Sequence, residues 1–125
     1  MKILVVEDNA AVRDLLARIL ERIGYVPVLA SHGKEGLAKA ISERPNLIIM
    51  DMRMPIMDGW ATARALRANP DTKNIPILAT TALSQSHQLK TCLDAGCNGY
   101  IVKPFSVRTL QRKIKKLLAA PIAEV

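Results

Sequence analysis

The chain has 125 residues, half of them hydrophobic, and a formal net charge of +7, which is typical of one domain (residues 1–125) with enough apolar material for a complete core. Its longest apolar runs are only strand-length, and Glu7 interrupts the run that follows Lys2, so the sequence indicates neither a membrane span nor a signal peptide. Cys92 and Cys97 lack the companions of a zinc site or a disulfide framework, so we expect small core side chains in a reducing cytoplasm.

Strand-length apolar runs alternate with amphipathic segments along the chain. The first run, residues 3–6, precedes a helical pattern over residues 12–23, with Asn9 as the expected N-cap and Gly24 just past the end. The alternation continues with strands at 26–30, 47–50, 75–80 and 99–102, and with helices at 34–43, 59–68, 84–95 and after a cap at Ser106. Five strand-then-helix units are therefore expected.

Acidic residues stand where two of these strands end. Glu7 and Asp8 follow the run at 3–6, and Asp51 follows the run at 47–50. Ligands of an open parallel sheet bind outside the carboxyl ends of its strands, so these carboxylates are expected to face one site. Two such charges about 4 Å apart repel by roughly 4 kcal/mol at an effective dielectric of about 20, which calls for a cation. Mg²⁺, which keeps several waters and takes one or two carboxylates, is the expected occupant.

The strands themselves predict the fold. They are near-continuous apolar runs, as in a parallel sheet that helices cover on both faces, which indicates an α/β sandwich of three layers. If Asp8 and Asp51 share one cation, the first and third strands must be neighbours. The second strand then lies outside them, giving a five-stranded parallel sheet of order 2-1-3-4-5 with five helices, which is the flavodoxin-like winding.

The last two strands add a hydroxyl and an ammonium group to the same edge. Thr81 ends the fourth strand and Lys103 the fifth. An aspartate can act as a nucleophile toward phosphorus, and phosphoryl transfer depends on positioning and charge neutralisation. We assign Asp51 as the nucleophile, Glu7, Asp8 and the Arg53 carbonyl as metal ligands with Asp51, and Thr81 and Lys103 as phosphoryl-oxygen ligands. Singly, the acids could merely favour helix N-termini and Thr81 could be a turn hydroxyl; their joint occurrence favours the site.

Four motifs carry a resemblance to a known family: Val-Val-Glu-Asp-Asn at 5–9, Asp-Met-Arg-Met-Pro-Ile-Met-Asp-Gly at 51–59, Thr-Ala at 81–82 and Lys-Pro-Phe at 103–105. Over its whole length the chain resembles a response regulator receiver domain. The resemblance implies phosphorylation of Asp51 by a histidine kinase or histidine phosphotransfer protein, dependence on Mg²⁺, and self-catalysed hydrolysis without further enzymatic activity. It also implies a cis bond before Pro104 and a shift of Thr81 coupled to reorientation of Tyr100, which could otherwise be an aromatic that packs for stability.

The environment of the site raises two further expectations. The Asp58-Gly59 pair is typical of a turn in which glycine relieves backbone strain. Arg53, two residues past Asp51, and Leu83, two past Thr81, occupy positions that vary in the family and tune how long the phosphoryl group lasts. A long cation and an apolar group could screen the phosphoryl group from water, so we expect a longer lifetime.

The signal is expected to leave through a protein surface built from residues 84–95, 99–102 and the last helix, as the resemblance implies. On the last helix Arg108, Arg112 and Lys115 form one stripe opposite Leu110, Ile114 and Leu117. We expect this stripe to bind an acidic downstream protein; the alternative is an ordinary solvated helix face.

Three other classes of protein share part of this sequence pattern. A flavodoxin-like electron carrier needs a hydroxyl- and glycine-rich phosphate loop where this chain has Glu7 and Asp8. A phosphohydrolase of the haloacid dehalogenase type uses an aspartyl nucleophile, but it needs a second acid where Arg53 stands. A nucleic-acid-binding module could use the basic last helix, but one Trp, one Phe and two Tyr provide no stacking platform. We therefore do not expect nucleic acid as a partner.

Overall fold

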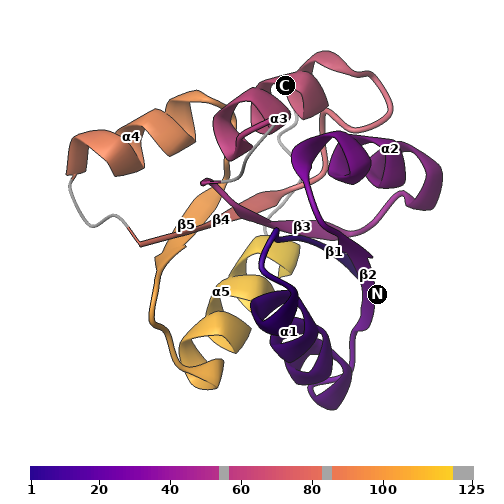
Figure 1. The fold of residues 1–125 in the computed structure, drawn as a ribbon, viewed down its shortest axis with the longest axis vertical. Helices are drawn as coiled ribbons and strands as arrows, with labels where there is room; N and C mark the ends of the chain where they lie inside the picture. Colours follow the sequence, from indigo (N-terminus) through magenta and orange to yellow (C-terminus); the bar gives the residue numbers. More distant parts are fainter. Residues whose placement is uncertain (54–56, 83–85, 120–125) are drawn as a thin grey trace.

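The computed structural model describes residues 1–53, 57–82 and 86–119. These residues form five strands and five helices in strict alternation (Figure 1). The elements are β1 (Lys2–Val6), α1 (Ala10–Arg22), β2 (Val26–Ala30), α2 (Gly33–Glu43), β3 (Leu47–Asp51), α3 (Gly59–Ala68), β4 (Ile77–Thr81), α4 (Ser86–Asp94), β5 (Gly99–Val102) and α5 (Val107–Ala119).

All five strands pair in parallel, in the order β2-β1-β3-β4-β5, so the predicted topology is confirmed. The register aligns the carboxyl ends of the inner strands: Val6 of β1 pairs with Met50 of β3, and Asp51 pairs with Thr80 of β4. Residues that follow β1, end β3 and end β4 therefore meet at one edge of the sheet.

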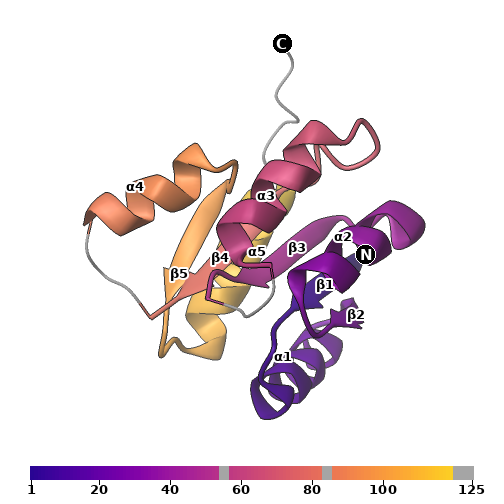
Figure 2. The ribbon, with the colours of Figure 1, turned by 45° about the horizontal axis from the view of Figure 1, so that its top comes forward.

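Helices cover both faces of the sheet. In Figure 1 α2, α3 and α4 lie above the strands and α1 and α5 lie below, an arrangement that the turned view of Figure 2 also shows. Successive strand residues point to opposite faces: Leu4 and Val6 pack in one hydrophobic cluster, while Ile3 and Val5 pack in the other. Because both faces are buried, the strands need apolar residues at every position, which explains their near-continuous runs.

The helix ends follow local chemistry. Asn9 is the N-cap of α1, as predicted, because its side chain accepts a hydrogen bond from Val12 N at 3.0 Å. His32 caps α2 in the same way, accepting from Glu35 N through Nδ1 at 3.1 Å. The predicted start of the last helix is also confirmed, since the Ser106 hydroxyl accepts from Thr109 N at 3.1 Å.

The fourth strand begins later than its sequence pattern predicts. It starts at Ile77 rather than at residue 75. Ile75 N donates to Thr72 O at 3.1 Å, so Ile75 belongs to the preceding turn, and Pro76 has no N–H for a sheet hydrogen bond. The expected helix start at residues 84–85 lies outside the described residues; α4 is described from Ser86.

Strand β2 forms one edge of the sheet. Val26 N donates to Met1 O at 2.9 Å, so the backbone N–H groups of alternate residues in β2 point away from β1. Pro27, at one of these outward positions, has no N–H, and the outward carbonyl of Leu29 accepts a hydrogen bond from Lys39 Nζ. The outer side of this strand therefore offers few free backbone groups.

None of the helices in the described ranges is both long enough and apolar enough to cross a lipid bilayer.

Candidate functional site

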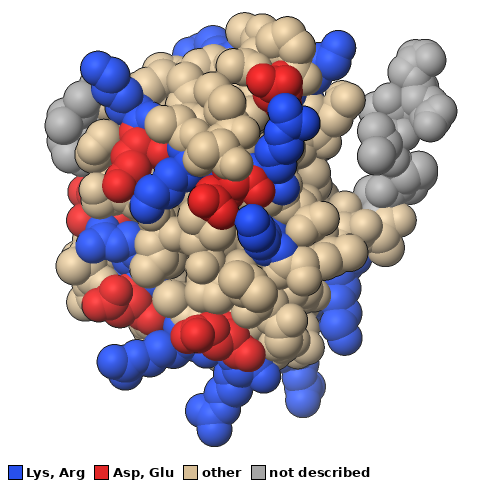
Figure 3. All heavy atoms as spheres, turned by 90° about the vertical axis from the view of Figure 1, so that its right-hand side faces the viewer, with Lys and Arg blue, Asp and Glu red and all other residues tan. Residues whose placement is uncertain are grey.

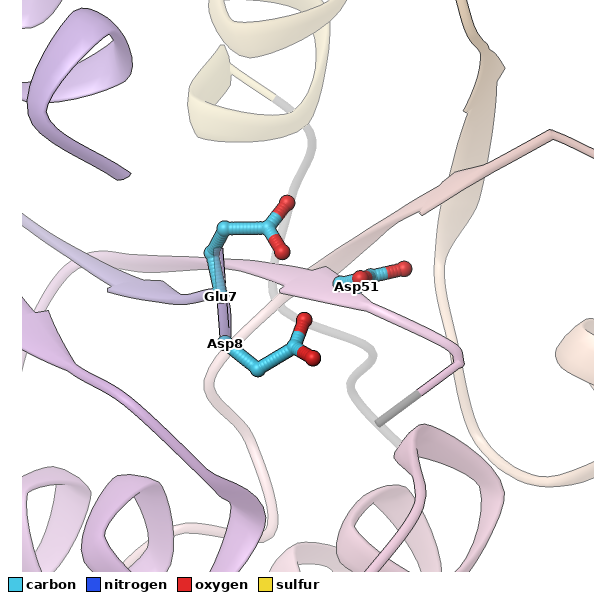
Figure 4. Close-up of side chains that lie close together, drawn as sticks. All are labelled: Glu7, Asp8 and Asp51. Atoms are coloured by element: carbon cyan, nitrogen blue, oxygen red, sulfur yellow. The ribbon is translucent and has the colours of Figure 1, made fainter. Parts of the chain in front are cut away.

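Three carboxylates meet at the carboxyl edge of the sheet. Glu7 follows β1, Asp8 comes next, and Asp51 is the last residue of β3. One carboxylate oxygen from each lies within 4.8 Å of those of the other two, and Figure 4 shows the three side chains around a common space. Glu7 is 2% exposed and Asp51 8%, whereas Asp8 is exposed to solvent. This is an oxygen-ligand set of the kind that holds a hard divalent cation.

Hydrogen bonds orient the two buried carboxylates. Asn9 N donates to Glu7 Oε2 at 3.2 Å, and Arg53 N donates to Asp51 Oδ1 at 3.2 Å. The backbone of Glu7 is held too, because Arg13 Nη1 donates to its carbonyl at 2.8 Å. We did not predict a role for Arg13; the signal was its place in the first turn of α1, one turn after the Asn9 cap.

Lys103 places a positive charge among the acids. Its Nζ lies 3.2 Å from Glu7 Oε1 and 3.7 Å from Asp51 Oδ1. Lys103 follows β5, and its backbone N–H donates to Thr81 O at 2.7 Å, which ties the end of β5 to the end of β4. The peptide bond between Lys103 and Pro104 is cis, as the resemblance implies. The structure thus brings Lys103 into direct contact with two of the predicted acids.

Thr81 is the last residue of β4 and is buried. Its neighbour Thr80 pairs with Asp51 across the sheet, so Thr81 lies one residue beyond Asp51 on the adjoining strand. The hydroxyl-bearing residue and the central acid therefore share one edge, as predicted from the sequence.

Burial changes the acidity of Glu7. It raises the pKa of this carboxyl to about 7, and the negative charge of Asp51 acts in the same direction. The Asn9 N–H opposes the change in pKa by stabilising the ionised form. A cation bound at this edge would favour the ionised form of Glu7.

The loop after β3 has a glycine for a reason other than the predicted one. Gly59 does not have a positive φ; its N–H donates to Met52 O at 3.1 Å, and an added Cβ would lie 2.5 Å from Met52 Cα. Glycine is required because the start of α3 approaches the backbone next to Asp51, not because it relieves strain. Asp58 is the N-cap of α3, accepting from Ala61 N at 2.8 Å.

Comparison with known proteins identifies this arrangement. Residues 3–115 match the sequence model of the response regulator receiver domain. The chain belongs to this family. Receiver domains are parts of two-component signalling systems and act as switches rather than as classical enzymes, so the resemblance inferred from the four motifs is confirmed.

Relatives of this receiver domain include a protein described as a probable transcriptional regulator and a chemotaxis protein. It is 40% identical over 117 residues to the "Probable transcriptional regulator ycf27" of Porphyridium aerugineum, covering 94% of this chain and 48% of that protein. It is 33% identical to the chemotaxis protein CheY4 of Vibrio cholerae, with a TM-score of 0.88 over 93% of this chain and 97% of that one. The chain spans about half the length of the curated relatives it matches.

A third relative bears on the acidic cluster. The receiver domain of the sensor histidine kinase PA1611 from Pseudomonas aeruginosa PAO1 is 34% identical, with a TM-score of 0.89 over 95% of this chain and 98% of that one. Its structure is described with a magnesium ion coordinated in the active site cleft. An ion in that receiver agrees with the oxygen-ligand set found at the carboxyl edge here.

Tyr100 and Arg53 are the other predicted site residues that the structure describes. Tyr100 on β5 is half-buried, and Lys113 Nζ of α5 lies 5.1 Å from the centroid of its ring, a cation–π contact between the two elements. The Arg53 side chain is exposed. Leu83, the second predicted lifetime position, lies outside the described residues.

The predicted basic stripe exists on α5. Arg108, Arg112 and Lys115 are exposed, and Leu110 and Ile114 on the opposite side of the helix are fully buried. Helix α5 has five basic residues and no acidic one. By contrast, basic and acidic side chains are interspersed on the face around α1, β2 and α2 (Figure 3), where Lys2 pairs with Glu43 and Lys39 with Glu35. An excess of positive charge is therefore a property of α5.

Proposed function

We propose that this receiver domain is a magnesium-dependent phosphoacceptor switch that takes a phosphoryl group on Asp51 from a histidine kinase or histidine phosphotransfer protein. One observation carries the proposal: carboxylate oxygens of Glu7, Asp8 and Asp51 lie within 4.8 Å of one another with an ammonium group beside them. The donor set suits Mg²⁺, which favours carboxylate and carbonyl oxygens and retains waters. Glu7, Asp8, Asp51 and the Arg53 carbonyl would hold the ion.

In the transfer step a carboxylate oxygen of Asp51 attacks phosphorus, and the bond from phosphorus to the donor breaks with the electron pair leaving on the donor. Lys103 neutralises charge on the phosphoryl oxygens, and Thr81 donates its hydroxyl to them. When bound, Mg²⁺ supplies further charge neutralisation on these oxygens. In hydrolysis a water attacks phosphorus and Asp51 leaves as a carboxylate. This self-directed hydrolysis is the only turnover that we propose.

The position of Lys103 supports its role. Its Nζ contacts both Glu7 Oε1 and Asp51 Oδ1. A small movement of the Lys103 side chain would therefore bring its ammonium group beside a phosphoryl group carried by Asp51. A phosphoryl group adds about −1.5 to −2 charges at this edge, and the Lys103 ammonium group already lies close to Asp51.

Signal output is proposed to follow from movement of Thr81 toward the phosphoryl group and reorientation of Tyr100. Thr81 O accepts from Lys103 N, which joins β4 to the end of β5, and Tyr100 lies on β5 beneath Lys113. A shift at Thr81 therefore has a backbone route to Tyr100 and the α4-β5-α5 surface. Such a two-state rearrangement would turn a local charge into a new contact surface.

We propose that the stripe formed by Arg108, Arg112 and Lys115 binds an acidic downstream protein in the cytoplasm. All three side chains are exposed on a helix without acidic residues, which favours a negatively charged partner. Charge reversal of all three should weaken binding to the output partner at least tenfold and reduce its dependence on salt. Unchanged affinity, or salt-dependent binding to DNA in place of protein, would contradict this assignment.

The decisive experiment is phosphorylation by a small donor. With acetyl phosphate and Mg²⁺ the intact mass should rise by one phosphoryl group, about 80 Da, and chelation of the metal should abolish the gain. Asp51→Asn should not gain mass. Asp71→Asn is the matched control, because Asp71 is exposed and pairs with Arg44 on another part of the surface. A phosphoryl group on Asp51→Asn, or steady turnover of a generic phosphate ester, would refute the proposal.

A further inference from the structure

Backbone hydrogen bonds bring Cys92 and Cys97 close together where α4 ends. Cys97 N donates to Cys92 O at 3.2 Å, Gly96 N donates to Leu93 O at 3.0 Å, and Gly96 has a left-handed φ of +115°. These two bonds and the glycine form a Schellman motif, in which Cys92 and Cys97 occupy the two positions whose side chains commonly touch across the helix end. The proximity of Cys92 and Cys97 therefore results from the backbone conformation at the helix end and not only from their closeness in the sequence.

Helix α1 ends in the same motif and provides an internal comparison. There Tyr25 N donates to Leu20 O at 2.9 Å, Gly24 N donates to Glu21 O at 3.2 Å, and Gly24 has a φ of +100°. Leu20 and Tyr25 pack in the same hydrophobic cluster. In α4 the equivalent positions are two thiols, and both again belong to one cluster.

The surroundings of the thiols determine their reactivity. Cys92 is 1% exposed and Cys97 6%. Burial raises the pKa of the Cys97 thiol to about 12, while the nearby Arg67 guanidinium favours its thiolate. Arg67 is held in place because its Nε donates to Gly96 O at 2.8 Å. The pair is therefore slow to react at neutral pH and accessible only to a small oxidant.

We infer that Cys92 and Cys97 are a modification site that forms an intramolecular disulfide on exposure to a peroxide. The thiolate of Cys97 attacks one peroxide oxygen, the O–O bond breaks, and the products are a sulfenic acid and, after protonation of hydroxide, water. The Cys92 sulfur then attacks the sulfenic sulfur, loses its proton and expels a second water. In total two thiols and one hydrogen peroxide give one disulfide and two waters.

The disulfide would link the last turn of α4 to the residues that lead into β5. Cys97 lies before the amino end of β5, whereas the acid cluster lies at the carboxyl edge with Lys103. Oxidation should therefore restrain α4 without altering the carboxylates. The inference is independent of the proposed phosphoryl chemistry, because its assay needs neither Mg²⁺ nor a phosphoryl donor.

The experiment treats the folded, reduced protein with hydrogen peroxide and maps tryptic peptides. Because Pro104 follows Lys103, trypsin leaves both cysteines in one peptide, residues 91–108, which has no methionine. This peptide should lose two hydrogens, about 2 Da, and regain them with dithiothreitol. Oxidation of Met1, which is 65% exposed, verifies the peroxide dose. The rate should rise about tenfold for each pH unit between pH 7 and 9, as the thiolate population rises.

Single Cys92→Ser and Cys97→Ser variants, with Cys→Ala versions in case the hydroxyl disturbs the core, should not lose the two hydrogens. The inference fails if the wild-type peptide gains only oxygen, if it crosslinks between molecules, or if it stays unmodified on prolonged treatment at pH 9, where Met1 is fully oxidised. Peptide mapping of the wild type decides the question even if every variant is unstable.

Discussion

The ammonium nitrogen of Lys103 lies 3.2 Å from Glu7 Oε1, although 96 residues separate the two in the chain. With all three acids ionised, one ammonium against three carboxylates leaves two negative charges in the cluster (3 − 1 = 2). Lys103 therefore reduces the repulsion without removing it. The remaining charge makes the edge receptive to a divalent cation and links the stability of the domain to pH and metal.

Glu7 should make the metal-free domain less stable as pH rises. Because burial raises its pKa from the ordinary 4.5 to about 7, the folded state binds more protons than the unfolded chain between these values. The contribution of Glu7 to the free energy of unfolding is full below pH 4.5 and is lost as pH rises to 7, by up to about 3 kcal/mol. Urea unfolding in a chelator at pH 5 and pH 8 measures this change.

Glu7→Gln should remove most of that pH dependence and raise stability at pH 8. The exposed Glu43→Gln serves as the control, since Glu43 pairs with Lys2 at the surface. Identical pH profiles for wild type and Glu7→Gln would show that the buried carboxyl does not titrate as described.

Asp8→Asn should raise the melting temperature of the metal-free protein. The substitution removes one of three clustered negative charges at an exposed position, so we expect a rise of roughly 2–5 °C with weaker Mg²⁺ binding. Calorimetry with and without Mg²⁺ measures both effects. Asp14→Asn, on the exposed side of α1, should change neither the melting temperature nor Mg²⁺ binding. A lowered melting temperature for Asp8→Asn would contradict the claim that repulsion among the three carboxylates destabilises the metal-free protein.

Arg53 and Leu83 should lengthen the life of the phosphoryl group. The backbone of Arg53 already contacts Asp51 Oδ1, and its exposed side chain can cover the site from water. Arg53→Ala combined with Leu83→Ala should raise the rate of hydrolysis several-fold, followed by intact mass after removal of the donor. Arg64→Ala on α3 is the control. An unchanged rate of hydrolysis in the double variant would contradict the hypothesis that Arg53 and Leu83 screen the phosphoryl group from water.

Gly59→Ala should destabilise the domain, because the new Cβ would lie 2.5 Å from Met52 Cα and 2.8 Å from Asp51 O. The backbone beside the phosphoacceptor must shift, so we expect a loss of about 1–3 kcal/mol together with weaker Mg²⁺ binding. In Gly99→Ala the nearest atoms are 3.7 Å away, so that variant should stay near wild type. Equal unfolding midpoints for the two variants would contradict the close approach.

Much of the fold could be predicted because the same residues indicate where the strands lie, whether both sheet faces are covered and which strands are neighbours. Runs such as residues 47–50 are apolar at every position only if both faces are covered, and the expectation that Asp8 and Asp51 share a cation predicted β3 beside β1, where the structure has it. Boundaries were less predictable. Ile75 has a strand-like side chain, yet its N–H is used by a turn that depends on Thr72 O.

The site was predictable in composition but not in its contacts. Strand ends indicated which residues share the edge, whereas the contacts of the Lys103 ammonium group with Glu7 and Asp51 are seen only in the folded chain. Arg67 was missed altogether. In the sequence it is an ordinary cation near a helix end, and only the fold brings it to the carbonyl groups of Lys73, Ile75 and Gly96.

The edge formed by β2 has a consequence for the behaviour of the domain at high concentration. Pro27 and the occupied carbonyl of Leu29 deny a second molecule the regular row of donors and acceptors that sheet polymerisation requires. Copies of this domain are thus protected from fibril-like growth on that side. Any specific assembly there must use side chains rather than a shared ladder.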